Sequence, residues 1–79
     1  MPTFMFEVYY HPPEDAAREA RISAAVTAAG GRLDFREPAP QADGPICLTF
    51  EFENRAQADA VAEALRKAGE HVEGVSDYG

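Results

Sequence analysis

Three side chains in this sequence, His11, Cys47 and His71, carry donor groups from which proteins build zinc and copper sites. Two imidazoles and one thiolate match the ligand types and number of such sites. The three residues lie far apart in the chain, so they can act together only if the fold brings them to one place. A zinc or copper site is therefore a hypothesis that depends on the fold, and no other cofactor is expected.

The same three residues allow a second chemistry, in which the Cys47 thiol is a nucleophile activated by His11 or His71. Such a thiol needs a lowered pKa and a backbone nest that binds an oxyanion. No motif in the sequence indicates either feature. Catalysis by Cys47 is therefore not expected, and the question of whether the chain is an enzyme stays open, with a non-enzyme preferred.

Several glutamates are candidates for a general base in a dimeric barrel: Glu7, Glu51, Glu53 and Glu73. Arg32 and Arg36 lie on a neighbouring segment and carry the opposite charge. We expect these two arginines to pair with Glu51 and Glu53 across the sheet, as facing charges on paired strands ordinarily do. Glu51 and Glu53 would then stabilise the sheet rather than act in catalysis.

The composition of the chain limits the classes of partner and the cellular compartment that we expect for it. The chain has 79 residues, room for one domain over residues 1–79, and its formal net charge of −7 repels phosphate backbones, so nucleic acid is not expected as a partner. A single cysteine cannot form an intramolecular disulfide, and no signal-peptide pattern opens the sequence. No apolar run approaches the roughly 20 residues of a membrane-spanning helix. We expect a cytoplasmic protein with no membrane partner.

Four segments alternate apolar and polar residues with the two-residue period of a β-strand. They cover residues 3–11, 32–36, 46–53 and 71–77. On the first three, the alternation predicts one core-facing side made of Phe4, Phe6, Val8, Tyr10, Leu33, Phe35, Ile46, Leu48, Phe50 and Phe52. The last segment is weaker, because Val72 and Val75 have opposite parity and Gly74 interrupts it, so we expect an edge strand there.

Two segments carry apolar residues at helical spacing, and a proline-rich polar segment separates the second and third strands. The expected helices cover residues 13–29 and 55–68, and the expected loop covers residues 37–45. Pro12 and Pro13 end the first strand and preset the first helical turn. Asn54 caps the second helix, with Gln57 at capping-box spacing.

The resulting order is strand, helix, strand, strand, helix, strand. Two right-handed crossovers that share one sheet interleave their strands in the order 4-1-3-2 and place both helices on one face. The predicted class is α+β, ferredoxin-like split β-α-β (βαββαβ), with a four-stranded antiparallel sheet. This order and the acidic charge resemble those of several small regulators that inhibit larger enzymes by binding them, a resemblance of fold that implies no site residues.

The face of the sheet without helices holds the residues that the core does not need. The first strand runs antiparallel to the third and fourth, so its end meets both of their beginnings. We therefore expect His11, Cys47 and His71 to share one edge of this face. The apolar contacts on the same face are expected from Met5, Tyr9 and Val75, with the last of these depending on the register of its strand.

Two functions from different classes follow from this layout. The preferred one is a non-catalytic interaction or regulatory domain, whose uncovered sheet face or an exposed edge strand binds a protein, either a second copy of itself or a different chain. The alternative is a small enzyme or a ligand- or metal-binding protein, whose cavity forms between the facing sheets of a homodimer. Tyr9, His11 and Glu73 or Glu7 line that cavity.

Overall fold

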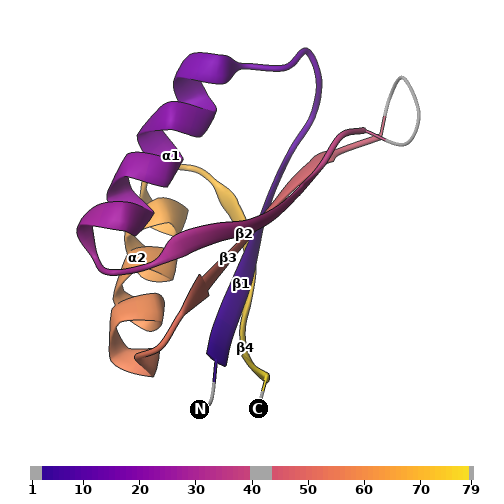
Figure 1. Cartoon of the computed structure of the whole chain (residues 1–79). Helices are drawn as coiled ribbons and strands as arrows, with labels where there is room; N and C mark the ends of the chain where they lie inside the picture. Colours follow the sequence, from indigo (N-terminus) through magenta and orange to yellow (C-terminus); the bar gives the residue numbers. More distant parts are fainter. Residues whose placement is uncertain (1–2, 40–43, 79) are drawn as a thin grey trace.

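The computed structural model describes residues 3–39 and 44–78, which form one sheet and two helices (Figure 1). The elements are β1 (Thr3–Tyr10), α1 (Ala16–Ala28), β2 (Arg32–Glu37), β3 (Ile46–Phe52), α2 (Arg55–Lys67) and β4 (His71–Tyr78). This is an α+β fold, with the element order predicted from the sequence.

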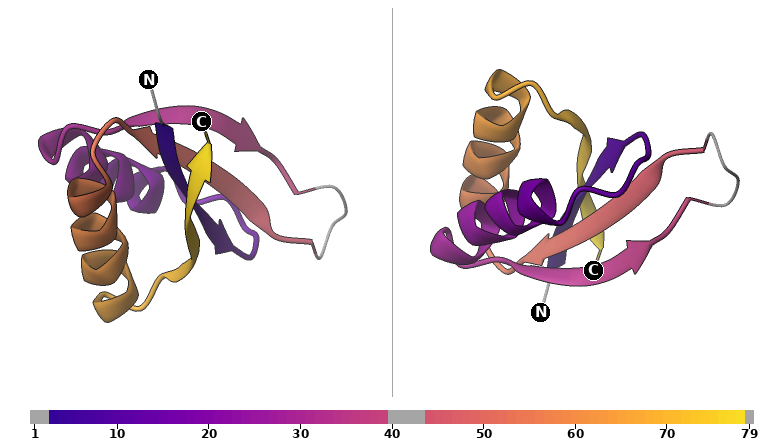
Figure 2. Two further views of the ribbon diagram at one scale, coloured as in Figure 1. Left: turned by 90° about the horizontal axis from the view of Figure 1, so that it is seen from below. Right: turned by 90° about the horizontal axis from the view of Figure 1, so that it is seen from above.

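The sheet is open and its strands pair antiparallel in the order β2-β3-β1-β4. Read from the other edge, this is the predicted order 4-1-3-2, so that prediction is confirmed. β3 and β1 are the inner strands, and β2 and β4 are the edges. Figure 2 shows both helices against one face of the sheet. The opposite face, which no described helix covers, is called the open face below.

Helix α1 begins later than predicted. Its first residue is Ala16, because Asp15 is the N-cap: the Asp15 backbone is extended, and its side chain accepts a hydrogen bond from the Arg18 N–H at 2.9 Å. Pro12 and Pro13 therefore belong to the connection after β1. The prediction that these prolines preset the first helical turn is wrong, since a side-chain cap nearer the helix fixes its start.

Helix α2 has the predicted cap. The Asn54 side chain accepts a hydrogen bond from the Gln57 N–H at 3.0 Å. At the other end the chain turns through Gly69, whose φ of 96° favours glycine, and the Glu70 N–H donates to the Leu65 carbonyl at 3.0 Å. This is a Schellman motif, which satisfies carbonyls that the last helical turn leaves free.

The core lies between the two helices and the sheet. Its buried members are Phe6, Val8, Ile22, Val26, Leu48, Phe50, Phe52, Ala58, Val61, Ala62 and Leu65. The Phe6 ring packs on both neighbouring phenylalanines of β3, with centroids 5.8 Å from Phe50 and 5.6 Å from Phe52. Each large apolar side chain buried here contributes about 1.5–3 kcal/mol before chain entropy is subtracted.

Strand β2 carries a β-bulge that the sequence pattern does not predict. Leu33 lies opposite Phe50 and Phe35 lies opposite Thr49, so Asp34 is the extra residue. The bulge moves Phe35 from the predicted core side to the open face, where it is 59% exposed. Leu33 keeps its predicted side but is 46% exposed, because β2 is at the edge of the sheet.

The same bulge moves Arg36 to the helix side. Its guanidinium donates to Glu19 of α1 and to Glu14 just before that helix. The predicted pairing across the sheet is therefore wrong for Arg36. It is confirmed for Arg32, whose Nε lies 2.5 Å from an Oε1 of Glu51.

Strand β4 carries a second bulge. Met5 lies opposite Ser76 and Phe6 lies opposite Gly74, which leaves Val75 as the extra residue. Gly74 has a φ of 109°, a backbone conformation suited to glycine. Val75 packs against the core, so its predicted place on the open face is wrong: the bulge reverses the alternation at that point.

The connection between β2 and β3 is shorter than the predicted loop. Glu37, its expected first residue, is the last residue of β2, and residues 40–43 lie outside the described part of the chain. Of the two helices in the described residues, neither is long and apolar enough to cross a membrane.

Candidate functional site

The strand register defines the layout of the open face. Side chains of directly opposite residues on paired strands project from the same face. From β2 to β4, the open face consists of the rows Arg32, Glu51, Met5 and Ser76; Phe35, Thr49, Glu7 and Glu73; and Glu37, Cys47, Tyr9 and His71. The face therefore combines glutamates with an exposed aromatic ring on β2 and a tyrosine and a histidine at the opposite side.

Cys47 lies on the open face and is nevertheless only 6% exposed. Its Sγ lies 3.8 Å from Oε2 of Glu7 and 3.9 Å from Oγ1 of Thr49. Burial raises the pKa of the Cys47 thiol, and the Glu7 carboxylate acts in the same direction. Because the thiolate is the form that attacks substrates and binds metals, this environment does not favour either chemistry at neutral pH.

Tyr9 lies between Cys47 and His71 across the sheet. Burial and the neighbouring Cys47 and Glu7 raise the pKa of the Tyr9 phenol, which therefore stays protonated at neutral pH. Its ring centroid is 5.9 Å from that of the His71 imidazole, with an interplanar angle of 70°. The two rings thus form an edge-to-face pair.

The three predicted metal ligands lie toward one end of the open face, but they do not form a ligand set. Cys47 and His71 lie on opposite sides of Tyr9 in the strand register, and His11 follows the end of β1. The Nε2 of His71 is instead 2.7 Å from Oε2 of Glu73. Within the described part of the chain, no three His, Cys, Asp or Glu side chains are grouped so that they could hold a metal ion. The geometry gives no support to the zinc or copper hypothesis.

A hollow of about 500 Å³ opens at this end of the sheet. It is lined by Tyr9, Tyr10, His11, Pro45, His71 and Glu73. Three of these residues, Tyr9, His11 and Glu73, were predicted from the sequence to line a cavity between two copies of the chain. The structure brings them to one hollow within a single chain, because the end of β1 meets the beginnings of β3 and β4.

No family is found for this chain. Neither a scan against protein-family models nor a search of curated proteins gives a match.

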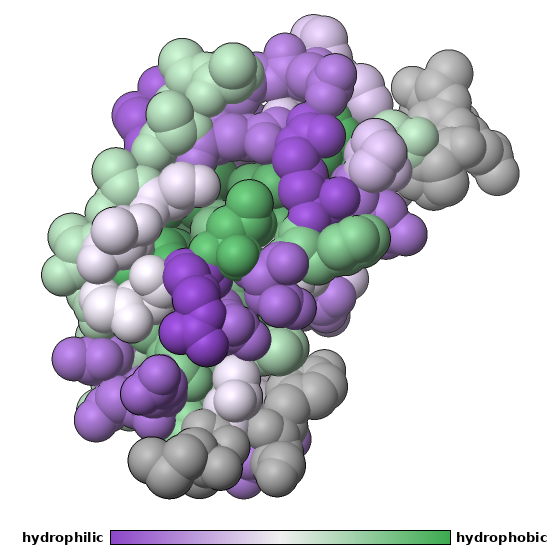
Figure 3. Space-filling model, in the orientation of Figure 1, coloured by the Kyte–Doolittle hydropathy of each residue, from purple (hydrophilic) through white to green (hydrophobic). Residues whose placement is uncertain are grey.

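The apolar residues found on the open face differ from those of the predicted interaction surface. Met5 and Tyr9 lie half-buried on the open face, whereas Val75 packs against the core. Phe35 takes the place of Val75 as the exposed apolar residue of this face, and no local signal in the sequence identifies it, because its alternation with Leu33 predicts burial. Figure 3 shows apolar surface near the middle of the view, where β2 crosses the molecule in Figure 1, bordered by hydrophilic surface.

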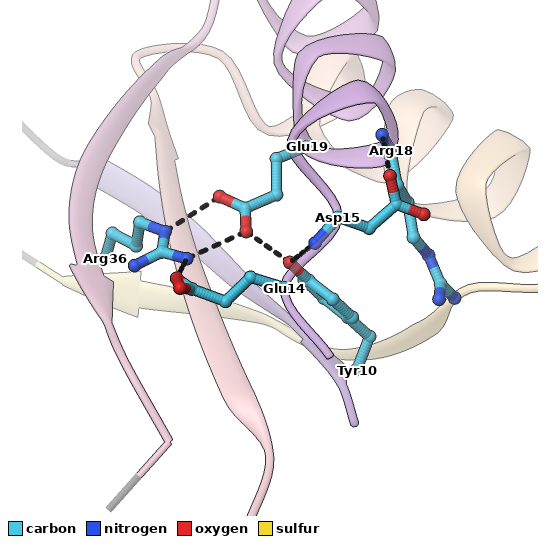
Figure 4. Close-up of polar contacts among 6 residues, drawn as sticks. All are labelled: Tyr10, Glu14, Asp15, Arg18, Glu19 and Arg36. Carbon is cyan, nitrogen blue, oxygen red and sulfur yellow. Dashed lines mark hydrogen bonds and ion pairs between the residues drawn. The ribbon is translucent and has the colours of Figure 1, made fainter. Parts of the chain in front are cut away.

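A polar network on the helix side holds β2 against the start of α1 (Figure 4). Arg36 donates to Glu19 through Nε at 2.8 Å and to Glu14 through Nη2 at 2.5 Å. The Tyr10 hydroxyl donates to the second oxygen of Glu19 and accepts from the Asp15 N–H at 3.0 Å. The hydrogen bonds from Arg36 lower the pKa of Glu19. The two carboxylates are already bound by Arg36, and the Tyr10 phenol is bound by Glu19 and Asp15. The network therefore has a structural role.

Proposed function

We propose that this chain is a non-catalytic interaction or regulatory domain of the ferredoxin-like, split β-α-β class, and that it binds a basic protein partner through its open face. The observation that carries the proposal is Phe35, a large aromatic side chain that is 59% exposed on that face. An exposed phenylalanine adds little to the stability of the domain, whereas aromatic side chains dominate the energetics of protein interfaces.

Phe35 is presented on rigid backbone. It belongs to β2, which pairs with β3, and it lies directly opposite Thr49. A side chain on an ordered strand loses less conformational freedom on binding than one on a loop, so more of its contact energy appears as affinity. Bulges re-aim side chains in this way at many functional sites, and here the bulge at Asp34 turns Phe35 outward.

A small sheet can also bind a partner by pairing an edge strand with a strand of that partner. Both edges of this sheet disfavour such pairing. The bulges at Asp34 in β2 and Val75 in β4 interrupt the regular array of backbone groups that a neighbouring strand needs. On β4, Arg66 Nη2 also lies 2.5 Å from the Gly74 carbonyl oxygen and 3.3 Å from that of Val72. The open face is therefore favoured over either edge.

The charge of the open face favours a basic partner over a second copy of the chain. Its charged members are four glutamates and one arginine: Glu7, Glu37, Glu51, Glu73 and Arg32. Arg32 is already paired with Glu51, and among the described residues Glu7 and Glu37 take part in no ion pair. Two such faces repel each other, whereas lysine or arginine side chains of a partner find carboxylates to pair with.

Affinity capture with matched variants tests the proposal. Immobilised wild-type chain should retain a basic protein from cell extract, and the purified pair should bind with an affinity that falls as NaCl rises from about 0.05 to 0.5 M. Phe35→Ser should weaken binding of the purified pair by about 30-fold, the effect of losing an aromatic side chain at the centre of an interface.

Leu33→Ser is the matched control. It removes an exposed apolar side chain from the same strand but from the opposite face, so binding should change less than about threefold. Equal losses in the two variants would identify the β2 edge rather than the open face as the contact surface. A partner that binds equally well at all salt concentrations, or that is acidic, would contradict the charge argument.

The alternative drawn from the sequence, a small enzyme or ligand-binding protein, is supported by a different observation. The hollow beside His71 is lined by Tyr9, His11 and Glu73, and all of its lining residues belong to one chain.

A further inference from the structure

We infer that the hollow beside His71 is a binding site for an alkylammonium group, carried either by a free organic cation or by a lysine side chain of a polypeptide. This inference goes beyond the proposed interaction with a basic protein and does not depend on it. It rests on the aromatic side chains that line the hollow, on the negative charge of Glu73 and on the absence of lysine and arginine from the described lining residues.

Aromatic rings form much of the lining. Tyr9 and His71 are held at 70° to each other with centroids 5.9 Å apart, and His11 also contributes to the wall. Tyr10 lines the hollow as well, but its ring lies under the Arg18 guanidinium and its hydroxyl bonds Glu19 on the helix side. The raised pKa of Tyr9 keeps its ring in the neutral phenol form. A neutral phenol ring attracts alkylammonium groups through its negative face, the kind of contact by which proteins recognise choline and methylated lysine.

Glu73 supplies the negative charge. Its Oε2 lies 2.7 Å from His71 Nε2, a contact that fixes the carboxylate beside the ring pair. In the strand register Glu73 lies directly opposite Glu7, whose carboxylate adds negative potential on the same face. A cation in the hollow therefore meets a positioned carboxylate in addition to the rings.

The lining excludes the opposite class of ligand. The described residues that line the hollow include no lysine or arginine, so a phosphate or carboxylate ligand would find no permanent cation among them. The formal net charge of −7 also lowers the concentration of anions near the surface and raises that of cations. A volume of about 500 Å³ is within the usual range for small-molecule sites and accommodates a small organic cation.

The hollow and Phe35 are separate surfaces. Phe35 is on β2 at one edge of the sheet, whereas the hollow lies beside β1 and β4 at the other. Phe35→Ser should therefore leave cation binding unchanged. Failure of the partner-binding proposal and failure of this inference are thus distinguishable.

NMR titration of the ¹⁵N-labelled chain tests the inference. Choline chloride should cause saturable shifts of the backbone amide signals of Tyr9, His71 and Glu73, with a dissociation constant of about 1–10 mM for so open a site. NaCl at equal ionic strength should leave these signals unchanged. The neutral carbon isostere of choline, 3,3-dimethylbutan-1-ol, should bind at least about fivefold more weakly, because it lacks the charge.

Two variants sharpen the test, one that removes the carboxylate charge and one that removes the Tyr9 ring. Glu73→Gln should weaken choline binding by about fivefold or more, and Tyr9→Leu should weaken it similarly, with folding of each variant verified from the dispersion of its spectrum. Glu53→Gln removes the same charge from an exposed side chain beyond the far end of β3 and should change binding by less than about twofold. The inference is overturned by absence of saturable shifts, by equal binding of the isostere, or by equal effects of Glu73→Gln and Glu53→Gln.

A second set of probes separates the two sources of the ammonium group. Nα-acetyl-lysine methylamide and a short capped peptide with one trimethyllysine are titrated beside choline under the same conditions. Tighter binding of the peptide, with shifts extending beyond the hollow, identifies a polypeptide side chain as the ligand. Tighter binding of choline identifies a free organic cation.

Discussion

The thiol of Cys47 is covered by its neighbours on the open face rather than by another layer of the fold. Only 6% of the residue is exposed, and its sulfur lies near Glu7 and Thr49. Burial raises its pKa, so little thiolate is present at neutral pH. The sequence shows the thiol but not these surroundings, which depend on how β1 pairs with β3.

Glu19 is the residue whose ionisation matters most for the contact between β2 and α1. Its pKa is lowered, first by the hydrogen bonds from Arg36, so the folded state favours the carboxylate. A group with a lowered pKa stabilises the fold above its ordinary pKa of about 4.5 and loses that contribution as the pH falls through the folded value. Thermal stability should therefore decrease on acidification below about pH 4.5.

Glu19→Gln tests this assignment by thermal unfolding at pH 7 and pH 3. At pH 7 the variant should lose about 1–2 kcal/mol, since an amide cannot accept a charged hydrogen bond from Arg36 as well as a carboxylate does. At pH 3 the difference from wild type should shrink. Asp59→Asn, in the exposed ion pair with Arg55, is the control and should change stability by less than about 0.5 kcal/mol. A constant difference at both pH values would contradict the prediction.

The two edge strands differ from the inner strands in that each carries a bulge. β1 and β3 have a neighbour on both sides, and their alternation of buried and open-face residues is regular. β2 and β4 have one neighbour each, so an extra residue at Asp34 or Val75 disturbs only one ladder of hydrogen bonds. These bulges decide which side chains reach the open face.

Gly74→Ala tests the bulge in β4. Gly74 has a φ of 109°, and a Cβ added there would lie 3.1 Å from the Met5 carbonyl oxygen and 3.2 Å from the Phe6 Cα. Strain and crowding against backbone should together cost about 2–4 kcal/mol in urea unfolding. Gly69→Ala is the matched control: its φ is 96°, but no atom lies within 4 Å of the added Cβ, so it should cost only the strain of about 1–2 kcal/mol. Equal costs would show that crowding at the bulge is unimportant.

The difference between inner and edge strands explains which parts of the fold were predictable from the sequence. Alternation identified Phe6, Val8 and Phe50 as core residues, since inner strands keep one parity along their length. It failed for Phe35 and Val75, since a bulge depends on the partner strand rather than on local sequence.

In the candidate site, too, strand pairing could be predicted from the sequence, whereas side-chain packing could not. Tyr9, His11 and Glu73 line one hollow, because antiparallel pairing brings the end of β1 to the start of β4. The cavity predicted from the sequence, with Glu7 as the alternative to Glu73, was instead one between two copies of the chain. Cys47 was expected beside His11, but it turns to Glu7 and Thr49 on the other side of Tyr9, a choice that depends on side-chain packing.

At the scale of the whole molecule, the acidic open face and the bulged edges both disfavour self-association. We expect light scattering to give the mass of one chain, unchanged by dilution to low micromolar concentration at moderate salt. The homodimer considered from the sequence is the contrary outcome. If a dimer is found and Phe35→Ser dissociates it, the open face is an interface between copies, and the proposal of a basic partner is wrong.

The order β2-β3-β1-β4 has a consequence for the synthesis of the chain. β1 leaves the ribosome before the other three strands of this sheet, yet its two neighbours in the sheet are β3 and β4, and Thr3 pairs with Tyr78. Until β4 has emerged, one side of β1 has no strand to pair with and the apolar face of Phe6 and Val8 is incompletely covered. The domain must therefore fold after translation of its last strand rather than progressively, and a ribosome stalled before β4 should hold a nascent chain that proteases digest readily.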